Sequence, residues 1–293
     1  MPKLIECVPN FSVGSNVEVI RGIVDSVIKT EVKLLDASSD PDHGRLVLTF
    51  IGKPKDVAKA AFGSAKQAVN LIDLKKHVGG HPFIGAIDVI PFIPLKGAAM
   101  KDCVKLATDL GEEIAVKLGV PVFLYGKAAR VAERKALAEI RRGGLKILEE
   151  RIREKGPDFG GKELHKTAGA VAVGARDFLI AFNVNLKSRD IKIARSIAVK
   201  IRESGGGLPA VRAIGIDLPS RKLVQVSMNL VNYKKTGIKK AFDAVSSIAK
   251  KKKAKIHSSE IIGLIPKASS FPGMTDYLKL EGSSESKILE NYL

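Results

Sequence analysis

The chain has 293 residues and a strong excess of basic side chains: 49 Lys and Arg against 31 Asp and Glu give a formal net charge of +18. Hydrophobic residues make up 45% of the chain, aromatic residues only 5%, and Trp is absent. This composition excludes disordered and collagen-like proteins and indicates aliphatic cores for two medium domains. Only two cysteines occur, too few for a disulfide framework or a cysteine metal cluster.

The basic surface predicts anionic partners, and three interpretations are open. A Lys-rich solvated surface of the thermophilic kind explains much of the charge. A groove for a polyanionic small molecule is the second interpretation. A nucleic-acid interface is the least favoured, because the lysines are spread over many helices without interleaved aromatic residues. The run Lys250–Lys253 is expected at a helix end and solvated. No membrane-spanning stretch or signal peptide is recognised, so we expect a cytoplasmic protein without membrane partners.

Hydrophobic periodicity predicts the elements of the first half. An apolar strand over residues 4–8 is followed by a helix whose apolar face includes residues 20–28, strands over 33–37 and 46–51, a helix over 54–72, and a strand over 87–93. A helix over 101–118, a strand over 120–125 and a charged helix over about 128–150 extend this β-α-β-β-α-β order.

The second half repeats the same order of elements. Strand residues 170–173 continue through 178–183, and they precede a helix over 191–201, strands over 211–216 and 223–230, a helix over 238–249 and a strand over 256–265. The repeat predicts an α+β fold of two ferredoxin-like (βαββαβ) subdomains, with antiparallel or mixed sheets and helices on one face. The Gly/Pro-rich stretch 155–162 suggests domains 1–169 and 170–293, with a basic cleft between them as the binding site.

The stretch HVGGHPFIGAIDVIPFIP begins at His77 and contains a second histidine, His81. Gly79, Gly80 and Pro82 disfavour a helix, so His81 is predicted in a loop that leads into a strand. It could share a metal with His77, but no third close ligand is evident. It could be a buried structural histidine. It could also act as a general acid/base, because imidazole titrates near neutral pH and glycines let a substrate approach the backbone.

A second dense stretch, DASSDPDHGR, is predicted as a loop between two strands. It is either a plain turn or the mouth of a cleft, where Asp36 or Asp40 could orient His81 or hold an amine, with His43 beside them and Arg45 pairing a carboxylate. A calcium loop is excluded because the D-x-D-x-D-G pattern with a distal Glu is absent. Asn10, after the first strand, contributes to a polar rim that could receive an anion.

Five stretches in order, LIECVPNFSVG, HPFIGAIDVIPFIP, VPVFLYGKAAR, PDFG and GARDFLIAFNVNL, resemble the formiminotransferase domain of the formiminotransferase-cyclodeaminase family. The resemblance runs from residue 4 to about residue 266, and the cyclodeaminase module is missing. It implies a homodimeric transferase that moves the formimino group from N-formimino-L-glutamate to N5 of tetrahydrofolate in histidine degradation. No metal is implied. The alternative is a folate-binding protein acting on another one-carbon folate such as 5-formyltetrahydrofolate, or a non-catalytic folate binder.

The resemblance also implies site residues. The family's catalytic histidine matches His81, and its folate-binding stretch matches residues 160–169. Within that stretch the candidate contacts are Gly160, Gly161, Lys162, His165, Lys166, Thr167 and Gly169. The chain departs from the family pattern at Val13, Gly80 and Phe83, where charged residues are usual, and Ser38 stands where the family has a carboxylate.

Overall fold

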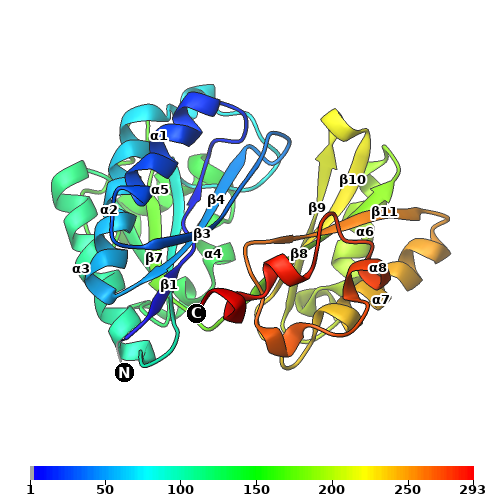
Figure 1. The fold of residues 1–293 in the computed structure, drawn as a ribbon. Coiled ribbons are helices and arrows are strands. Elements are labelled where there is room, and N and C mark those ends of the chain that lie inside the picture. Colours follow the sequence, from blue (N-terminus) through cyan, green and yellow to red (C-terminus); the bar gives the residue numbers. More distant parts are fainter. Residues whose placement is uncertain (1–2) are drawn as a thin grey trace. The chain divides into compact units, whose positions relative to one another are not determined.

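The computed structural model describes residues 3–293 and divides into two compact units, one ending at Arg176 and one beginning at Asp177. Figure 1 shows the course of the chain in each. The fold is α+β, with helices α1–α8 and one sheet in each unit. Within residues 3–293 no helix has both the length and the apolar character needed to span a bilayer.

The first unit is built on a mixed seven-stranded sheet. Its strands are β1 (Ile5–Cys7), β2 (Asn10–Phe11), β3 (Lys33–Asp40), β4 (Arg45–Gly52), β5 (Ile87–Pro94), β6 (Val122–Gly126) and β7 (Val171–Ala175). The short strands β1 and β2 each pair antiparallel with both β4 and β5, and β3 closes one edge beside β4. On the other side β7 runs parallel to β5, and β6 parallel to β7.

Helices cover both faces of this sheet. On one face pack α1 (Val17–Ile28), α2 (Pro54–Leu71) and α3 (Met100–Leu118), which bury aliphatic residues against the strands. Local sequence fixes their ends: the Asn16 side chain caps α1, Pro54 opens α2, and Gly119 ends α3 with a left-handed backbone. On the other face, α4 (Leu137–Arg141) and α5 (Gly144–Lys155) pack over β5, β6 and β7.

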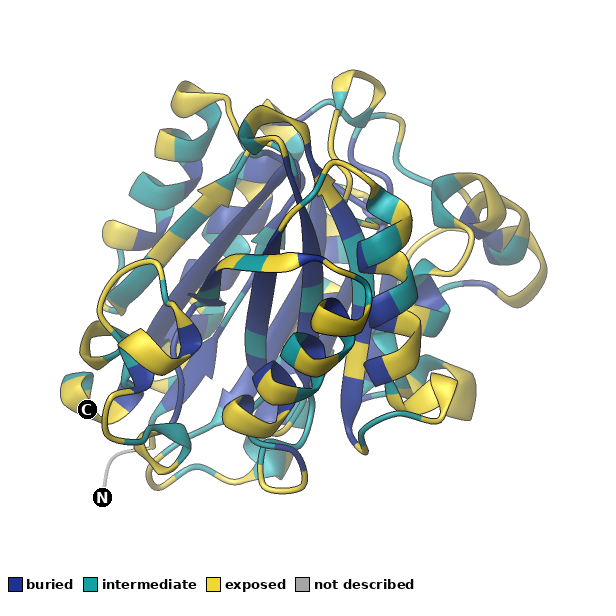
Figure 2. Cartoon of the chain, turned by 90° about the vertical axis from the view of Figure 1, so that its right-hand side faces the viewer, coloured by how far each residue is buried: buried dark blue, intermediate teal, exposed yellow. Residues whose placement is uncertain are grey.

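The second unit has an antiparallel four-stranded sheet in the order β11-β8-β10-β9. Along the chain it contains β8 (Ile180–Lys187), α6 (Ile191–Ile201), β9 (Val211–Leu218), β10 (Leu223–Leu230), α7 (Ile238–Lys251), β11 (Lys255–Ile262) and α8 (Met274–Leu278). Helices α6 and α7 bury their apolar faces against the sheet and form the core of this unit. Figure 2 shows mostly buried strands, while the helices are exposed along their outer sides.

Three sequence-based expectations for the first unit are wrong. Strand 171–175, expected to open the second half, pairs with β5 and β6 in the first sheet, so the compact unit extends beyond the predicted boundary at residue 169. The helix expected over about 128–150 is divided into a 3-10 turn, η2 (Ala132–Lys135), and the helices α4 and α5. The break between α4 and α5 falls at Gly143, whose φ of +82° does not continue a right-handed helix. Finally, helices cover two faces and not one.

Candidate active site

His81 lies in the loop between the 3-10 turn η1 (Leu74–Lys76) and β5, as the glycines and Pro82 predicted. The loop rests directly on the turn between β3 and β4. The Gly80 amide donates to the Asp42 carbonyl oxygen at 2.9 Å, and the His81 amide to the His43 carbonyl oxygen at 3.4 Å. The His43 and His81 rings are stacked, with centroids 6.0 Å apart. His81 of the loop and His43 of the β3–β4 turn therefore lie side by side.

Glycine permits this close contact between the two loops. A Cβ on Gly79 would lie 2.5 Å from the His43 carbonyl oxygen, and one on Gly44 would lie 2.4 Å from the Val78 carbonyl oxygen. Gly44 also has a φ of +64°, which L side chains rarely adopt. Gly79 thus lets the His81 loop pack against the β3–β4 turn, whereas the Gly-Gly step was expected to open space for a substrate.

The imidazole of His81 is held in one tautomer. Its Nδ1 lies 2.8 Å from the Pro82 carbonyl oxygen, which can only accept a hydrogen bond, so Nδ1 carries the proton. Nε2 has no hydrogen-bond partner among residues 3–293 and keeps its lone pair. Burial lowers the pKa of His81 well below 6.5, and the positive charges of Arg45 and Arg141 lower it further. The ring is therefore neutral at physiological pH and can accept a proton at Nε2.

A buried ion cluster lies beneath this loop. Asp88 is fully buried on β5 and accepts from the Arg45 Nη2 at 2.7 Å, from the Arg141 Nε at 3.2 Å, and from a second nitrogen of Arg141. It also accepts from the Ile84 amide at 3.0 Å. Burial alone would raise the pKa of Asp88, but the guanidinium groups of Arg141 and Arg45 bring it below its usual range. Asp88 is thus a carboxylate that fixes two cations and the end of the His81 loop.

Arg45 connects the ion cluster to the imidazole. Its Nη2 also donates to the Pro82 carbonyl oxygen at 3.0 Å, the same oxygen that accepts from His81, and its Nη1 donates to the Asn10 side-chain oxygen at 2.8 Å. Burial lowers the pKa of Arg45 to about 10, so it stays charged at neutral pH. Arg45 was expected to pair a substrate carboxylate, but its guanidinium group makes three hydrogen bonds inside the protein. The Asn10 side chain also has its partners inside the protein, because it accepts from Arg45 and donates to the Val8 carbonyl oxygen.

The acidic residues of DASSDPDHGR are not gathered in one loop. Asp36 and Asp40 belong to β3, which extends to residue 40, and Arg45 begins β4, so only residues 41–44 form the turn. Asp36 accepts from the Ser38 hydroxyl at 2.6 Å. Asp40 accepts from the His43 amide at 2.8 Å and fixes the turn under the two histidines. The expectation of a continuous polar loop is wrong because strand pairing with β4 continues through these positions.

The stretch 160–169 crosses the amino ends of the parallel strands β6, β7 and β5. Its first part lies at β6, where a Cβ on Gly160 would be 3.1 Å from the Cα of Pro121. Gly161 has open space around its Cα, and Lys162 and Lys166 are exposed.

The end of this stretch lies beside the His81 loop. His165 and Gly169 exchange two backbone hydrogen bonds of 2.9 Å, and the Leu74 amide donates to the Thr167 carbonyl oxygen at 2.9 Å. A Cβ on Gly169 would lie 2.5 Å from the Ile84 carbonyl oxygen, so glycine is required where this turn meets the start of β5. The fold thus brings residues 165–169 and the His81 loop together at the amino ends of β7 and β5.

Two members of the site, Asp88 and Arg141, were not predicted from the sequence. Asp88 had a readable signal, because a carboxylate inside the apolar run IDVIPFIP must find a partner if the strand is buried. Arg141 had none, since it is one of several arginines on a charged segment. No group of three or more His, Cys, Asp or Glu side chains in residues 3–293 is placed to hold a metal ion, and His77 instead contacts Phe83 and the Ser12 carbonyl oxygen.

Comparison with known proteins identifies the family. Residues 4–176 match the N-terminal subdomain of the formiminotransferase domain, and residues 181–289 match the formiminotransferase domain model that follows it. The chain belongs to the formiminotransferase family. The resemblance seen in the sequence is confirmed.

Formiminotransferase relatives align over the full length of the chain. A glutamate formimidoyltransferase of Streptococcus pyogenes serotype M1 is 42% identical over 100% of this chain and 99% of its own length. A glutamate formimidoyltransferase of Thermoplasma acidophilum is 43% identical over 98% and 96% of the two chains. The formimidoyltransferase-cyclodeaminase of Sus scrofa is 43% identical over 91% of this chain but only 51% of its own length. The resemblance implied a formimidoyltransferase, and the full-length relatives confirm this prediction.

Proposed function

We propose that this chain transfers the formimino group of N-formimino-L-glutamate to N5 of tetrahydrofolate, with His81 as the general acid/base. The observation that carries the role of His81 is its fixed tautomer: Nδ1 donates to the Pro82 carbonyl oxygen, and Nε2 is left as a free acceptor. The lowered pKa keeps this acceptor unprotonated at neutral pH.

The transfer needs one proton to move between two nitrogens. N5 of tetrahydrofolate attacks the formimino carbon and forms a tetrahedral intermediate. Nε2 of His81 takes the N5 proton and returns one to the glutamate nitrogen as the bond from that nitrogen to the carbon breaks. General acid/base catalysis of this kind contributes about 10²–10⁴-fold in rate, and alignment of the two substrates supplies the rest. This reaction needs no metal or redox group.

We assign Asp88, Arg45 and Arg141 as positioning residues. Asp88 holds both guanidinium groups, and Arg45 holds the Pro82 carbonyl oxygen against which the imidazole is oriented. Asn10 and Asp40 act in the same way, by fixing Arg45 and the turn that carries His43.

Folate recognition is proposed for residues 160–169, where Lys162 and Lys166 are exposed and available for the carboxylates of the folate glutamate. The resemblance supports this assignment, and so does the open space around Gly161, which leaves room for a ligand beside Lys162. A substrate role for Asp36, two ferredoxin-like subdomains with a basic cleft, a homodimer and a cytoplasmic location remain predictions.

The test is to mix the purified protein with N-formimino-L-glutamate and tetrahydrofolate and to measure the release of glutamate. We expect His81→Ala to abolish turnover while folate affinity stays within about tenfold, roughly 1.4 kcal/mol. His257→Ala is the matched control, because His257 is an exposed histidine on β11. Normal turnover by His81→Ala contradicts the acid/base role. Turnover of 5-formyltetrahydrofolate in place of formiminoglutamate contradicts the donor.

A further inference from the structure

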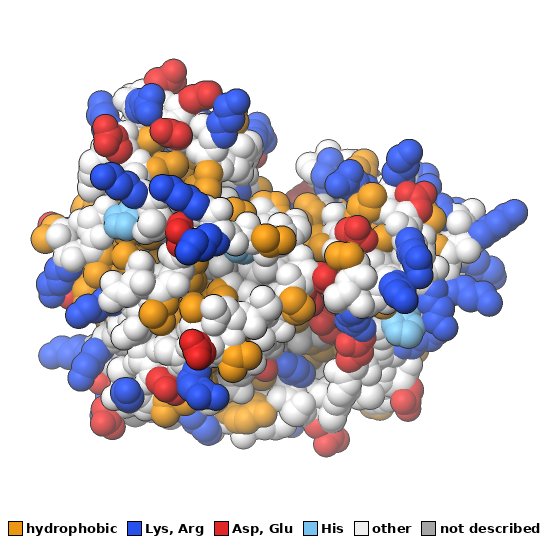
Figure 3. Space-filling view, turned by 90° about the horizontal axis from the view of Figure 1, so that it is seen from above, with side chains coloured by type: hydrophobic (Ala, Val, Ile, Leu, Met, Phe, Trp, Pro, Cys, Tyr) orange, Lys and Arg blue, Asp and Glu red, His pale blue; other side chains and the backbone are white. Residues whose placement is uncertain are grey.

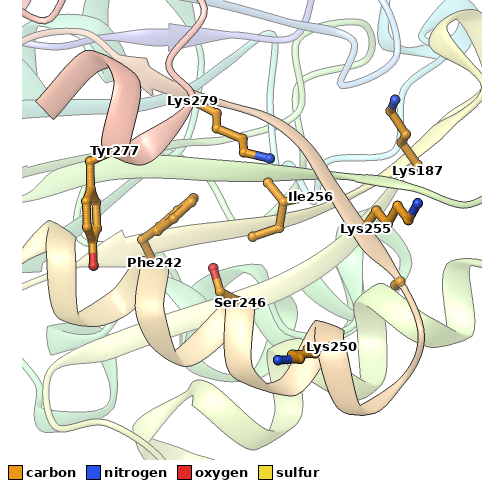
Figure 4. A pocket seen from close by; sticks show the side chains of 9 residues that line it. Lys187, Phe242, Ser246, Lys250, Lys255, Ile256, Tyr277 and Lys279 are labelled. Atoms are coloured by element: carbon orange, nitrogen blue, oxygen red, sulfur yellow. The ribbon is translucent and has the colours of Figure 1, made fainter. Parts of the chain in front are cut away.

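The second unit contains a pocket at the junction of α7, β11 and the end of α8. It has a volume of about 470 Å³ and is lined by Lys187, Phe242, Ser246, Lys250, Ala254, Lys255, Ile256, Tyr277 and Lys279. Figure 4 shows that these side chains come from segments far apart in the sequence. None of them belongs to the transfer site proposed above, and the pocket takes in one member of the Lys250–Lys253 run that the sequence analysis left as solvated.

The pocket carries four positive charges and no acid in its lining. Lys187, Lys250, Lys255 and Lys279 are all exposed, and none of them forms an ion pair with the described acids of the chain. Figure 3 shows Lys and Arg side chains gathered at the right-hand end of the molecule, which belongs to the second unit. Several like charges around one hollow repel each other and attract a multiply charged anion.

The end of the pocket opposite Lys187 and Lys255 is aromatic. Phe242 is almost fully buried and presents its ring to the pocket, and Tyr277 stands beside it with ring centroids 6.0 Å apart. The Tyr277 hydroxyl donates to the Asp243 carboxylate at 2.8 Å, which holds its ring in place. In Figure 4 the aromatic rings lie at one end and the ammonium groups of Lys187 and Lys255 at the other.

We propose that this pocket binds a nucleoside polyphosphate. The phosphates meet the lysine ammonium groups, which bind phosphate as compact point charges, and the base lies against the aromatic end. Three or four phosphate charges match four ammonium groups, and the Ser246 hydroxyl lines the pocket between the two ends. The lining holds no arginine fork of the kind that favours planar carboxylates, which is why we choose phosphate as the anion.

The proposal is tested by titrating ATP into the full-length protein at low ionic strength and measuring binding by calorimetry. We expect saturable binding that weakens as salt is added, because the lysines are exposed to screening. Adenosine and inorganic triphosphate, which each carry half of the recognised features, are expected to bind more weakly than ATP. If inorganic triphosphate binds as tightly as ATP, the aromatic end does not contribute to binding of the base and the proposal is wrong.

The variant Lys255→Gln/Lys279→Gln removes two charges from the pocket. We expect it to weaken ATP binding about tenfold to a hundredfold, or about 1.4–2.8 kcal/mol for the two contacts together, because both lysines are exposed and their attraction for phosphate is screened by water. The matched control is Lys192→Gln/Lys200→Gln, which removes the same charge from exposed positions on α6. Equal loss in both variants means that net charge alone attracts ATP and overturns the proposal. Tighter binding of a single-stranded oligothymidylate, lost in the pocket variant, overturns it in favour of a nucleic-acid surface. Glutamate release is expected to be unchanged in both variants.

Discussion

The buried carboxylate Asp88 allows a sharp test of how the His81 loop is held. Asp88→Asn keeps the size of the side chain but removes the charge that faces Arg45 and Arg141. In the native protein these groups have side-chain exposures of 0%, 8% and 14%. The substitution therefore leaves two guanidinium groups, one of them almost fully buried, without their counter-charge.

The expected loss follows from this burial. Removing one partner of a buried ion pair costs about 3–5 kcal/mol, because the remaining charge stays desolvated. For a unit of this size each kcal/mol lowers the unfolding midpoint by about 2–4 °C, so we expect a decrease of about 6–20 °C. The free energy of unfolding is measured by urea titration, and the midpoint by calorimetry. Glutamate release should fall as well, since Arg45 no longer has Asp88 to hold it against the Pro82 carbonyl oxygen.

The matched control is the same substitution in an exposed pair. Asp109→Asn on α3 removes a surface partner of Lys105 and should cost less than about 1 kcal/mol. The pH dependence adds a second check. Because the pKa of Asp88 is lowered on folding, its contribution is present above the ordinary value of 3.8 and is lost as the pH falls through the folded-state pKa. The reasoning is refuted if Asp88→Asn costs no more than Asp109→Asn, or if the gap from the native protein stays constant into strongly acid solution.

Two further predictions rest on other shifted groups. Because burial and two nearby cations lower the pKa of His81, the acid limb of the pH profile of kcat/KM should lie well below pH 6.5. Arg141→Met removes one of these cations and should move the limb to higher pH, whereas the control Arg142→Met should not. An unchanged limb in Arg141→Met would argue against the electrostatic effect. Burial raises the pKa of Glu6 from 4.5 to about 7 against the opposing charge of Arg176, so the folded state holds this proton more tightly and native stability falls as the pH rises through this range. Glu6→Gln should therefore gain stability relative to the native protein as the pH rises from about 4.5 to about 7 in urea titrations, and a constant difference over this range would contradict the assignment.

The repeated β-α-β-β-α-β order could be predicted because each element carries its own periodicity. Local signals such as Pro54 at the start of α2 and Gly119 at the end of α3 fixed several helix ends. The position of His81 in a loop was likewise local, since Gly79, Gly80 and Pro82 decide the backbone there. The family was readable from short motifs in order along the chain.

Long-range pairing decided the rest. Whether strand 171–175 joins the first or the second sheet depends on which strand edge it meets, and a short apolar run carries no sign of its partner. The same holds for the Asp88 cluster, because Arg45 and Arg141 are 43 and 53 residues away from it along the chain. The sequence determined which segment carries the imidazole. Only the tertiary structure decided which charges surround it. The adjacent Pro82 carbonyl oxygen sets the tautomer of His81, but burial and cations from distant elements set its pKa.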